Sequence, residues 1–433
     1  MDQRLELGTE GYSPAVLRLA VHKAEAMASF AAASADLMES VQVPMSAKHL
    51  QRLCGRIGGE WADQRDRQVE AYQERRLPRT YPQAAPAVAA VMVDSGKVQT
   101  RQADQPPGVH DPGWKNTNVA CCLTLKSKVS AEDPQPDPPQ KFLDPPKVLK
   151  IIAEVHARGT GGVGGTDAAA AERRRSKKRK TKRSKPAGSA AKKRVGKDPS
   201  RRKGPIKLVR TTVATMQDWE HFGWQVAAEV HRRSLDLAAR KAYVCDGQPC
   251  NWTLWEMHLQ ASGFVAILDI LHLLGYLYAA ACAAAGAAGP AAWRGYQRWL
   301  TLAWSGQTRV LLAELQAAAD RHGPPPAEAP ETDPRRVLVE TLRYVTHNQT
   351  RMDYPRYRKL GLPLSSAPVE SVVKQYNRRI KGSEKFWLED GVEAMQQIRA
   401  AYLCEDGRAE TNWKIPRPYR HAVGLGRLHA MAA

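Results

Sequence analysis

Three acidic residues stand where strands end or a helix begins. Asp94 and Asp246 each end a short apolar run typical of a strand, and Glu370 falls in the first turn of a helix predicted over 368–380. Carboxylates placed in this way can hold two Mg²⁺ ions, because Mg²⁺ prefers oxygen ligands and keeps several waters. Two such ions ~3.5–4 Å apart support phosphodiester displacement. With 44 acidic residues in the chain, spacing alone is a weak signal, and the elements that surround these residues must be considered.

The elements before and after Asp94 predict a three-stranded meander. Residues 88–93 form a continuous apolar run, which is typical of a buried central strand. Ser95-Gly96 is predicted to turn the chain into a second strand over 97–101, and residues 118–125 form a third. The strands at Val98 and Val119 are expected to run antiparallel to the first strand.

The second half of the chain predicts alternating helices and strands. Helical periodicity covers 217–237, and short strands are expected over 242–245 and 263–268. The apolar stretch 263–288 contains Asp269 and His272 and lacks flanking anchors, so it predicts a buried strand and helix and no membrane span. Residues 272–354 are predicted to be all helical.

The N-terminal part predicts a pair of helices joined by a short turn. The first helix covers 29–40, and the second begins at Ser46, a good N-cap, and ends at Gly58-Gly59. Helix, short turn and helix with a basic outer face is the outline of a helix-turn-helix, and an ordinary helical hairpin fits equally well. The outward residues of the second helix are candidate DNA contacts: Lys48, Gln51, Arg52 and Arg56.

Length and charge limit the class of protein. The chain has 433 residues, a net charge of +21 and 43% hydrophobic residues, which excludes a wholly disordered chain and allows two or three domains. Residues 173–203 hold 17 Lys or Arg and one acid, and so carry +16 of that charge. This basic arm is predicted to be a solvated, disordered segment that binds nucleic-acid phosphates, with a solubilising linker as the alternative. The seven cysteines have no CxxC pair, which argues against a disulfide scaffold or zinc knuckle and for a reducing compartment.

Four motifs resemble one family in their order and spacing. They are Val91–Arg101, Ala242–Gly247 followed by Asn251-Trp252, Ile267–His272, and Gly361–Ser371 followed by Arg378, Lys381 and Trp387. The chain is similar here to the DDE transposases of bacterial insertion sequences, the ISKra-like group. The resemblance covers roughly residues 12–125 and 207–403.

The resemblance implies an α/β fold with an RNase H-like mixed sheet, an all-helical insertion and an N-terminal helix-turn-helix-like domain. It implies a catalytic triad of Asp94, Asp246 and Glu370 that binds two Mg²⁺ ions, with Mn²⁺ as a substitute. Asp269, His272 and Trp252 are supporting residues, the first two shaping the site or contacting DNA. On the Glu370 helix, Lys374, Arg378 and Lys381 form a basic face beside Glu370 that can follow the DNA backbone.

These expectations define a domain plan and a function. The expected parts are a helical DNA-binding domain 1–80, a core 86–271 interrupted by a disordered Pro-rich and basic insertion 126–206, a helical insertion 272–354, a final core part 355–403 and a tail 404–433. The expected function is cleavage of transposon ends and their joining to target DNA, by a homodimer on double-stranded DNA in the cytoplasm, associated with the nucleoid. One alternative is an inactive, transposase-derived repressor or architectural DNA-binding protein, and another is a metal-dependent nuclease without strand transfer.

Overall fold

The computed structural model describes residues 12–80, 85–102, 113–159, 204–382 and 385–414. The chain divides into two compact units. Unit 1 comprises 1–126, 207–266 and 366–433, and unit 2 comprises 127–206 and 267–365. The basic arm lies outside the described residues.

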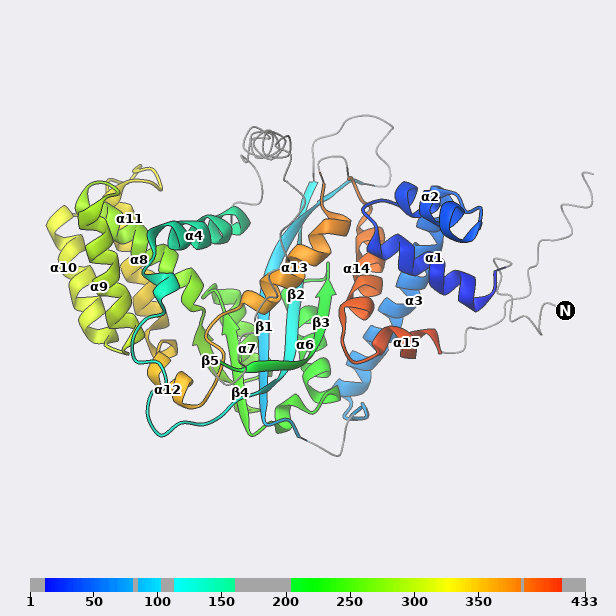
Figure 1. Ribbon diagram of the computed structural model, residues 1–433, viewed down its shortest axis with the longest axis horizontal. Coiled ribbons are helices and arrows are strands. Elements are labelled where there is room, and N and C mark those ends of the chain that lie inside the picture. The colour runs from blue at the N-terminus through cyan, green and yellow to red at the C-terminus, as the bar shows by residue number, and fades with distance from the viewer. Residues whose placement is uncertain (1–11, 81–84, 103–112, 160–203, 383–384, 415–433) are drawn as a thin grey trace, which may run out of the picture. The chain divides into compact units, whose positions relative to one another are not determined.

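A mixed five-stranded sheet is the frame of the fold, in the order β3-β2-β1-β4-β5 (Figure 1). Its strands are β1 (Val88–Thr100), β2 (Gly113–Lys126), β3 (Ile206–Thr215), β4 (Arg240–Cys245) and β5 (Val265–Leu268). β1 pairs antiparallel with β2 and parallel with β4. The prediction of one mixed sheet that joins the strands before Asp94, Asp246 and Asp269 is confirmed, as is the α/β class.

The predicted turn at Ser95-Gly96 is wrong. β1 continues through both residues, with Ser95 opposite Asn118 and Gly96 opposite Thr117 of β2. The segment around Val98 therefore belongs to the same strand as Val88, while the Val119 strand is antiparallel as predicted. The long partner strand explains the error, because its backbone groups continue the ladder where the sequence alone indicates a break.

Helices cover both faces of the sheet. Glu229 of α6 (Trp219–Arg232) accepts a hydrogen bond from Thr211 Oγ1, and Tyr376 of α13 (Ala367–Ile380) lies 2.8 Å, hydroxyl to hydroxyl, from Thr212. Thr211 and Thr212 are successive residues of β3, so their side chains point to opposite faces. α6 and α13 therefore lie on opposite sides of the sheet. The predicted helix 217–237 ends earlier, at Arg232, and a short 3₁₀ turn follows.

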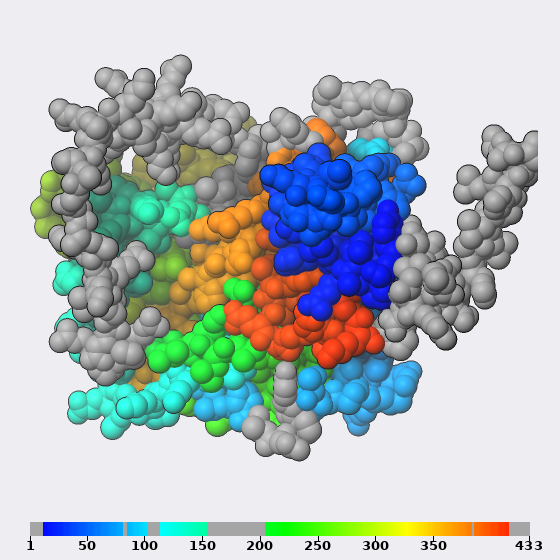
Figure 2. Space-filling view, turned by 45° about the vertical axis from the view of Figure 1, so that its right-hand side comes forward, coloured from blue at the N-terminus to red at the C-terminus, as the bar shows by residue number. Residues whose placement is uncertain are grey.

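The N-terminal helices pack with the C-terminal ones. α1 (Pro14–Ala26), α2 (Phe30–Val41) and α3 (Ala47–Gln73) lie against α14 (Glu389–Leu403) and α15 (Arg408–Trp413), and Figure 2 shows both groups side by side on one face. A buried ion pair joins Arg399 of α14 to Glu25 of α1. α14 and β3 have no counterpart in the predicted elements, and α15 lies in the segment expected as a tail.

Ser46 caps α3 as predicted, since its Oγ accepts a hydrogen bond from the His49 backbone N–H at 3.2 Å. The predicted helix end at Gly58-Gly59 is wrong, because α3 continues to Gln73. A Cβ on Gly58 would lie 2.2 Å from the carbonyl oxygen of Ala394 in α14. Gly58 therefore serves close packing of two helices, which a sequence pattern cannot distinguish from a helix stop.

Unit 2 is helical among its described residues apart from part of β5. Its helices are α4 (Pro145–Gly159), α8 (Ile270–Ala285), α9 (Pro290–Trp304), α10 (Thr308–His322), α11 (Pro334–Asn348) and α12 (Tyr354–Lys359). This confirms the predicted all-helical character of 272–354. The described start of the insertion is ordered, contrary to the prediction for 126–206: Arg358 Nε donates to Asp133 Oδ1 at 2.8 Å, and Trp304 Nε1 donates to the Gln135 carbonyl at 2.8 Å.

Candidate functional site

Asp94 and Asp246 stand on neighbouring parallel strands. The β1–β4 register pairs Val88 with Arg240 and Met92 with Val244. The same offset places Asp94 opposite Asp246, two residues beyond the last pair. Adjacent strands lie ~4.8 Å apart, and residues opposite each other in register share a face. The two half-buried carboxylates are therefore neighbours on one face of the sheet.

The Asp246 carboxylate is held by the turn and helix that follow it. Its Oδ1 accepts hydrogen bonds from the Gln248 backbone N–H at 3.1 Å and from Asn251 Nδ2 at 2.7 Å. Gly247 has φ +91°, a conformation that favours glycine. Asn251 belongs to α7 (Pro249–His258). Asn251 belongs to one of the four motifs, yet the sequence alone gave it no role, and its place in the first turn of a helix after Asp246 was the available signal.

Glu370 comes to the same face on α13. Gly96, two residues after Asp94, lies under this helix: a Cβ there would be 3.8 Å from a methyl of Val373 and 3.9 Å from Asn377 Oδ1. Asp94 and Gly96 point to the same face because β side chains alternate. Glu370 precedes Val373 by three residues and so shares its side of the helix. α13 thus brings Glu370 over the face of β1 that carries Asp94.

The buried Glu370 side chain has a local partner in Ser366, whose Oγ donates to Oε1 at 3.4 Å. Ser366 is buried and was also missed by sequence reasoning. Within the described residues, the oxygens of Asp94, Asp246 and Glu370 do not all lie within 4.8 Å of one another. The expected metal-bridging separation of 4–8 Å stays a prediction. Three carboxylates form an all-oxygen donor set, which fits Mg²⁺ and Mn²⁺.

The expected supporting residues have structural contacts of their own. Asp269 is fully buried and caps α8, its Oδ1 accepting the Leu271 N–H at 2.9 Å and its Oδ2 lying 2.8 Å from His272 Nδ1. This pair fixes the ring orientation of His272, whose side chain is 20% exposed. Trp252 of α7 is buried, with its ring edge-to-face against Tyr243 of β4 at 6.1 Å. Trp252 therefore packs in the core beneath the segment that carries Asp246.

The expected basic residues lie on two helices of unit 1. Lys48 and Arg52 are exposed on α3, and Arg56 is half-buried. On α13, Lys374 and Arg378 are exposed. Lys381 follows that helix, and its ammonium lies 5.9 Å from the ring centre of Trp114. None of these placements by itself identifies a nucleic-acid ligand.

Comparisons with known proteins add no assignment: no protein-family model matches the chain, and no curated protein matches it. Among the described helices, none has the length and apolar character needed to cross a membrane. The functional assignment therefore depends on the residues themselves and on the elements that place them.

Proposed function

We propose that the protein is a DDE transposase that cuts transposon ends and joins them to target DNA. The observation that carries the proposal is the placement of Asp94 and Asp246 on one face of two parallel strands, with Glu370 brought over that face by α13. The order β3-β2-β1-β4-β5, with β2 the antiparallel strand beside β1, supports an RNase H-like core.

In this proposal each acidic residue has a defined task. Asp94 and Asp246 hold the site from the rigid sheet, and Glu370 completes it from the first turn of α13. When bound, two divalent ions would supply nucleophile activation and charge stabilisation at the scissile phosphate. Asn251 and Gln248 keep the Asp246 carboxylate in one orientation, which is a positioning role. Lys374 and Arg378 extend the helix that carries Glu370 and would neutralise neighbouring DNA phosphates.

DNA is the partner that this site requires, and the charge distribution supports it. The basic arm supplies binding that is independent of sequence. The exposed Lys48 and Arg52 at the start of α3 are the proposed readers of the transposon ends. A homodimer on DNA is the proposed assembly, since two ends must be cut and joined together.

The test is cleavage and strand transfer on DNA that carries the element's own ends. Asp94→Asn, Asp246→Asn and Glu370→Gln should each abolish both reactions in Mg²⁺ and in Mn²⁺, while binding to end DNA changes little. Asp63→Asn, an exposed acid on α3, is the matched control and should retain activity.

The outcomes separate the candidate functions. Cleavage without joining indicates a metal-dependent nuclease. A wild-type protein that binds end DNA and never cuts it is an inactive, transposase-derived DNA-binding protein. Full activity in any one of the three variants would remove that residue from the proposed triad.

A further inference from the structure

A cavity of about 240 Å³ lies within unit 1, beside the edge strand β3. Its walls come from β3, α3, α6, α14 and α15. Asp94, Asp246 and Glu370 are not among the residues that line it. The cavity is therefore separate from the proposed catalytic site.

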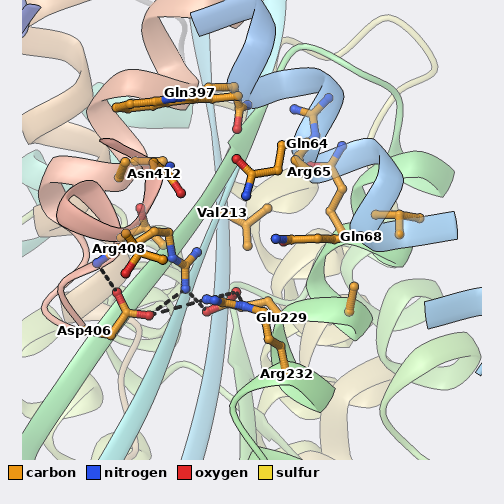
Figure 3. Close-up of a pocket in the computed structure, with 18 of the residues that line it drawn as sticks. Gln64, Arg65, Gln68, Val213, Glu229, Arg232, Gln397, Asp406, Arg408 and Asn412 are labelled. Carbon is orange, nitrogen blue, oxygen red and sulfur yellow. Dashed lines mark hydrogen bonds and ion pairs between the residues drawn. The ribbon is translucent and has the colours of Figure 1, made fainter. Parts of the chain in front are cut away.

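The wall of this cavity is rich in carboxamides. Figure 3 shows Gln64 and Gln68 of α3, Gln397 of α14 and Asn412 of α15 around one space, and Gln225 of α6 also lines it. Each carboxamide offers both N–H donors and a carbonyl acceptor. Such a wall suits a ligand that has donors and acceptors of its own.

The charged residues of the wall are already paired with one another. Arg408 Nη2 lies 2.7 Å from Glu229 Oε1 and 2.9 Å from Asp406 Oδ2, and Arg232 Nη2 lies 3.0 Å from Glu229 Oε2. Arg65 pairs with Asp66 and Glu393. Figure 3 shows the network of Glu229, Arg232, Asp406 and Arg408 along one side of the cavity.

A phosphate or carboxylate ligand would have to compete with these internal carboxylates for the guanidinium groups. The paired charges therefore favour a neutral ligand.

Two buried polar atoms in the wall lack a hydrogen-bond partner within the described protein. They are Gln225 Oε1, an acceptor, and Arg408 Nε, a donor. Gln225 is only 3% exposed, and its Nε2 donates to Gln217 Oε1 at 2.6 Å. That bond determines which end of the amide is the oxygen. Buried polar atoms normally have partners, so a ligand with one donor and one acceptor would satisfy both atoms.

We propose that this cavity binds a nucleobase. A base is neutral and planar and carries donors and acceptors along one edge, and Gln, Asn and Arg are the side chains that read such edges. Trp61 adds an aromatic ring to the wall. The volume is below the roughly 300–1,000 Å³ of pockets for larger ligands, which fits one ring system. The base can belong to a free nucleoside or to an unstacked position in a nucleic-acid strand.

The test is a titration of the full-length protein with adenosine, guanosine, cytidine and thymidine, followed by saturation-transfer NMR. At least one nucleoside should bind the wild-type protein. Gln225→Leu should weaken binding about 3- to 10-fold through loss of a hydrogen bond. Gln64→Leu, at a half-exposed position, should also weaken it and keeps the test valid if the buried variant fails to fold. Gln51→Leu, exposed on the same helix and outside the cavity wall, is the matched control.

A single-stranded oligonucleotide distinguishes the two sources. If it displaces the nucleoside from the wild-type protein, the natural ligand is a base within a strand, and if it does not, the ligand is a free nucleoside. The proposal is overturned if no nucleoside binds, if all three variants bind as the wild type does, or if crystals soaked with nucleoside show only ordered water between Gln225 and Arg408.

Discussion

Gly58 offers a sharp test of how the N-terminal helices are built into unit 1. In the structure it lies inside α3 where that helix packs on α14, and an added Cβ would be 2.2 Å from the Ala394 carbonyl oxygen and 2.6 Å from the Ala394 Cα. Favourable separations of carbon atoms are ~3.5–4.0 Å. Gly58→Ala would therefore force the two helices apart by about 1 Å, because a backbone carbonyl cannot rotate away as a side chain can.

Two effects of opposite sign set the magnitude. Alanine is better than glycine inside a helix by about 1 kcal/mol. Overpacking typically costs about 1–3 kcal/mol, and the rigid backbone of Ala394 places this site at the upper end. We expect Gly58→Ala to lower the free energy of unfolding by about 2 kcal/mol in total.

Gly55 and Gly59 are matched controls on the same helix. Neither would bring a Cβ within 4 Å of a neighbouring group, so Gly55→Ala and Gly59→Ala should each raise the free energy of unfolding by about 1 kcal/mol. The difference of about 3 kcal/mol corresponds to roughly 6–12 °C in Tm for a unit of this size. Differential scanning calorimetry measures it. Equal stability of the three variants would show that α3 does not dock on α14 at Gly58 and would restore the helix stop that the sequence pattern predicts.

Three further outcomes test other parts of the chain. The Arg358 hydrogen bond holds the pKa of Asp133 below its ordinary value of 3.8, so this pair stabilises the fold at neutral pH and the stabilisation disappears as pH falls through the lowered pKa. Asp133→Asn should cost about 2 kcal/mol at pH 7, and urea unfolding curves of variant and wild type should converge near pH ~2; a constant difference would contradict the pairing. Deletion of residues 173–203 should flatten the dependence of log K on log salt, by about 0.9 for each DNA phosphate that the basic arm neutralises, and should leave Tm nearly unchanged in a thermal melt. Lys48→Ala with Arg52→Ala should reduce discrimination between end DNA and random DNA in a gel-shift titration, and unchanged discrimination would assign end recognition elsewhere.

Local signals in the sequence predicted much of the fold. Ser46 is an N-cap, Pro290 opens a helix, and the apolar runs before Asp94, Asp246 and Asp269 are strands of one sheet. These features depend on residues close in sequence, since capping, proline geometry and apolar periodicity act within a few residues. The candidate acids were named for the same reason, as each directly follows a strand or begins a helix.

The errors share a physical cause, which is packing between segments distant in sequence. Ser95-Gly96 has the local pattern of a turn, yet β2 supplies hydrogen-bond partners that keep the strand extended. Gly58 has the local pattern of a helix stop, yet α14 packs so closely that only glycine fits. α14 and β3 were missed altogether.

The sequence by itself determined which residues have the chemistry for a carboxylate site and where a disordered, basic arm must be expected, because both follow from residue type and local charge density. Only the tertiary structure decided that Asp94 and Asp246 face the same way, through the parallel register of β1 and β4. It also decided that α13 crosses Gly96 with Glu370 on its inner side, and that carboxamides from helices at both ends of the chain line one cavity. Register and helix docking are set by the packing of the whole chain, and no short window of sequence contains that information.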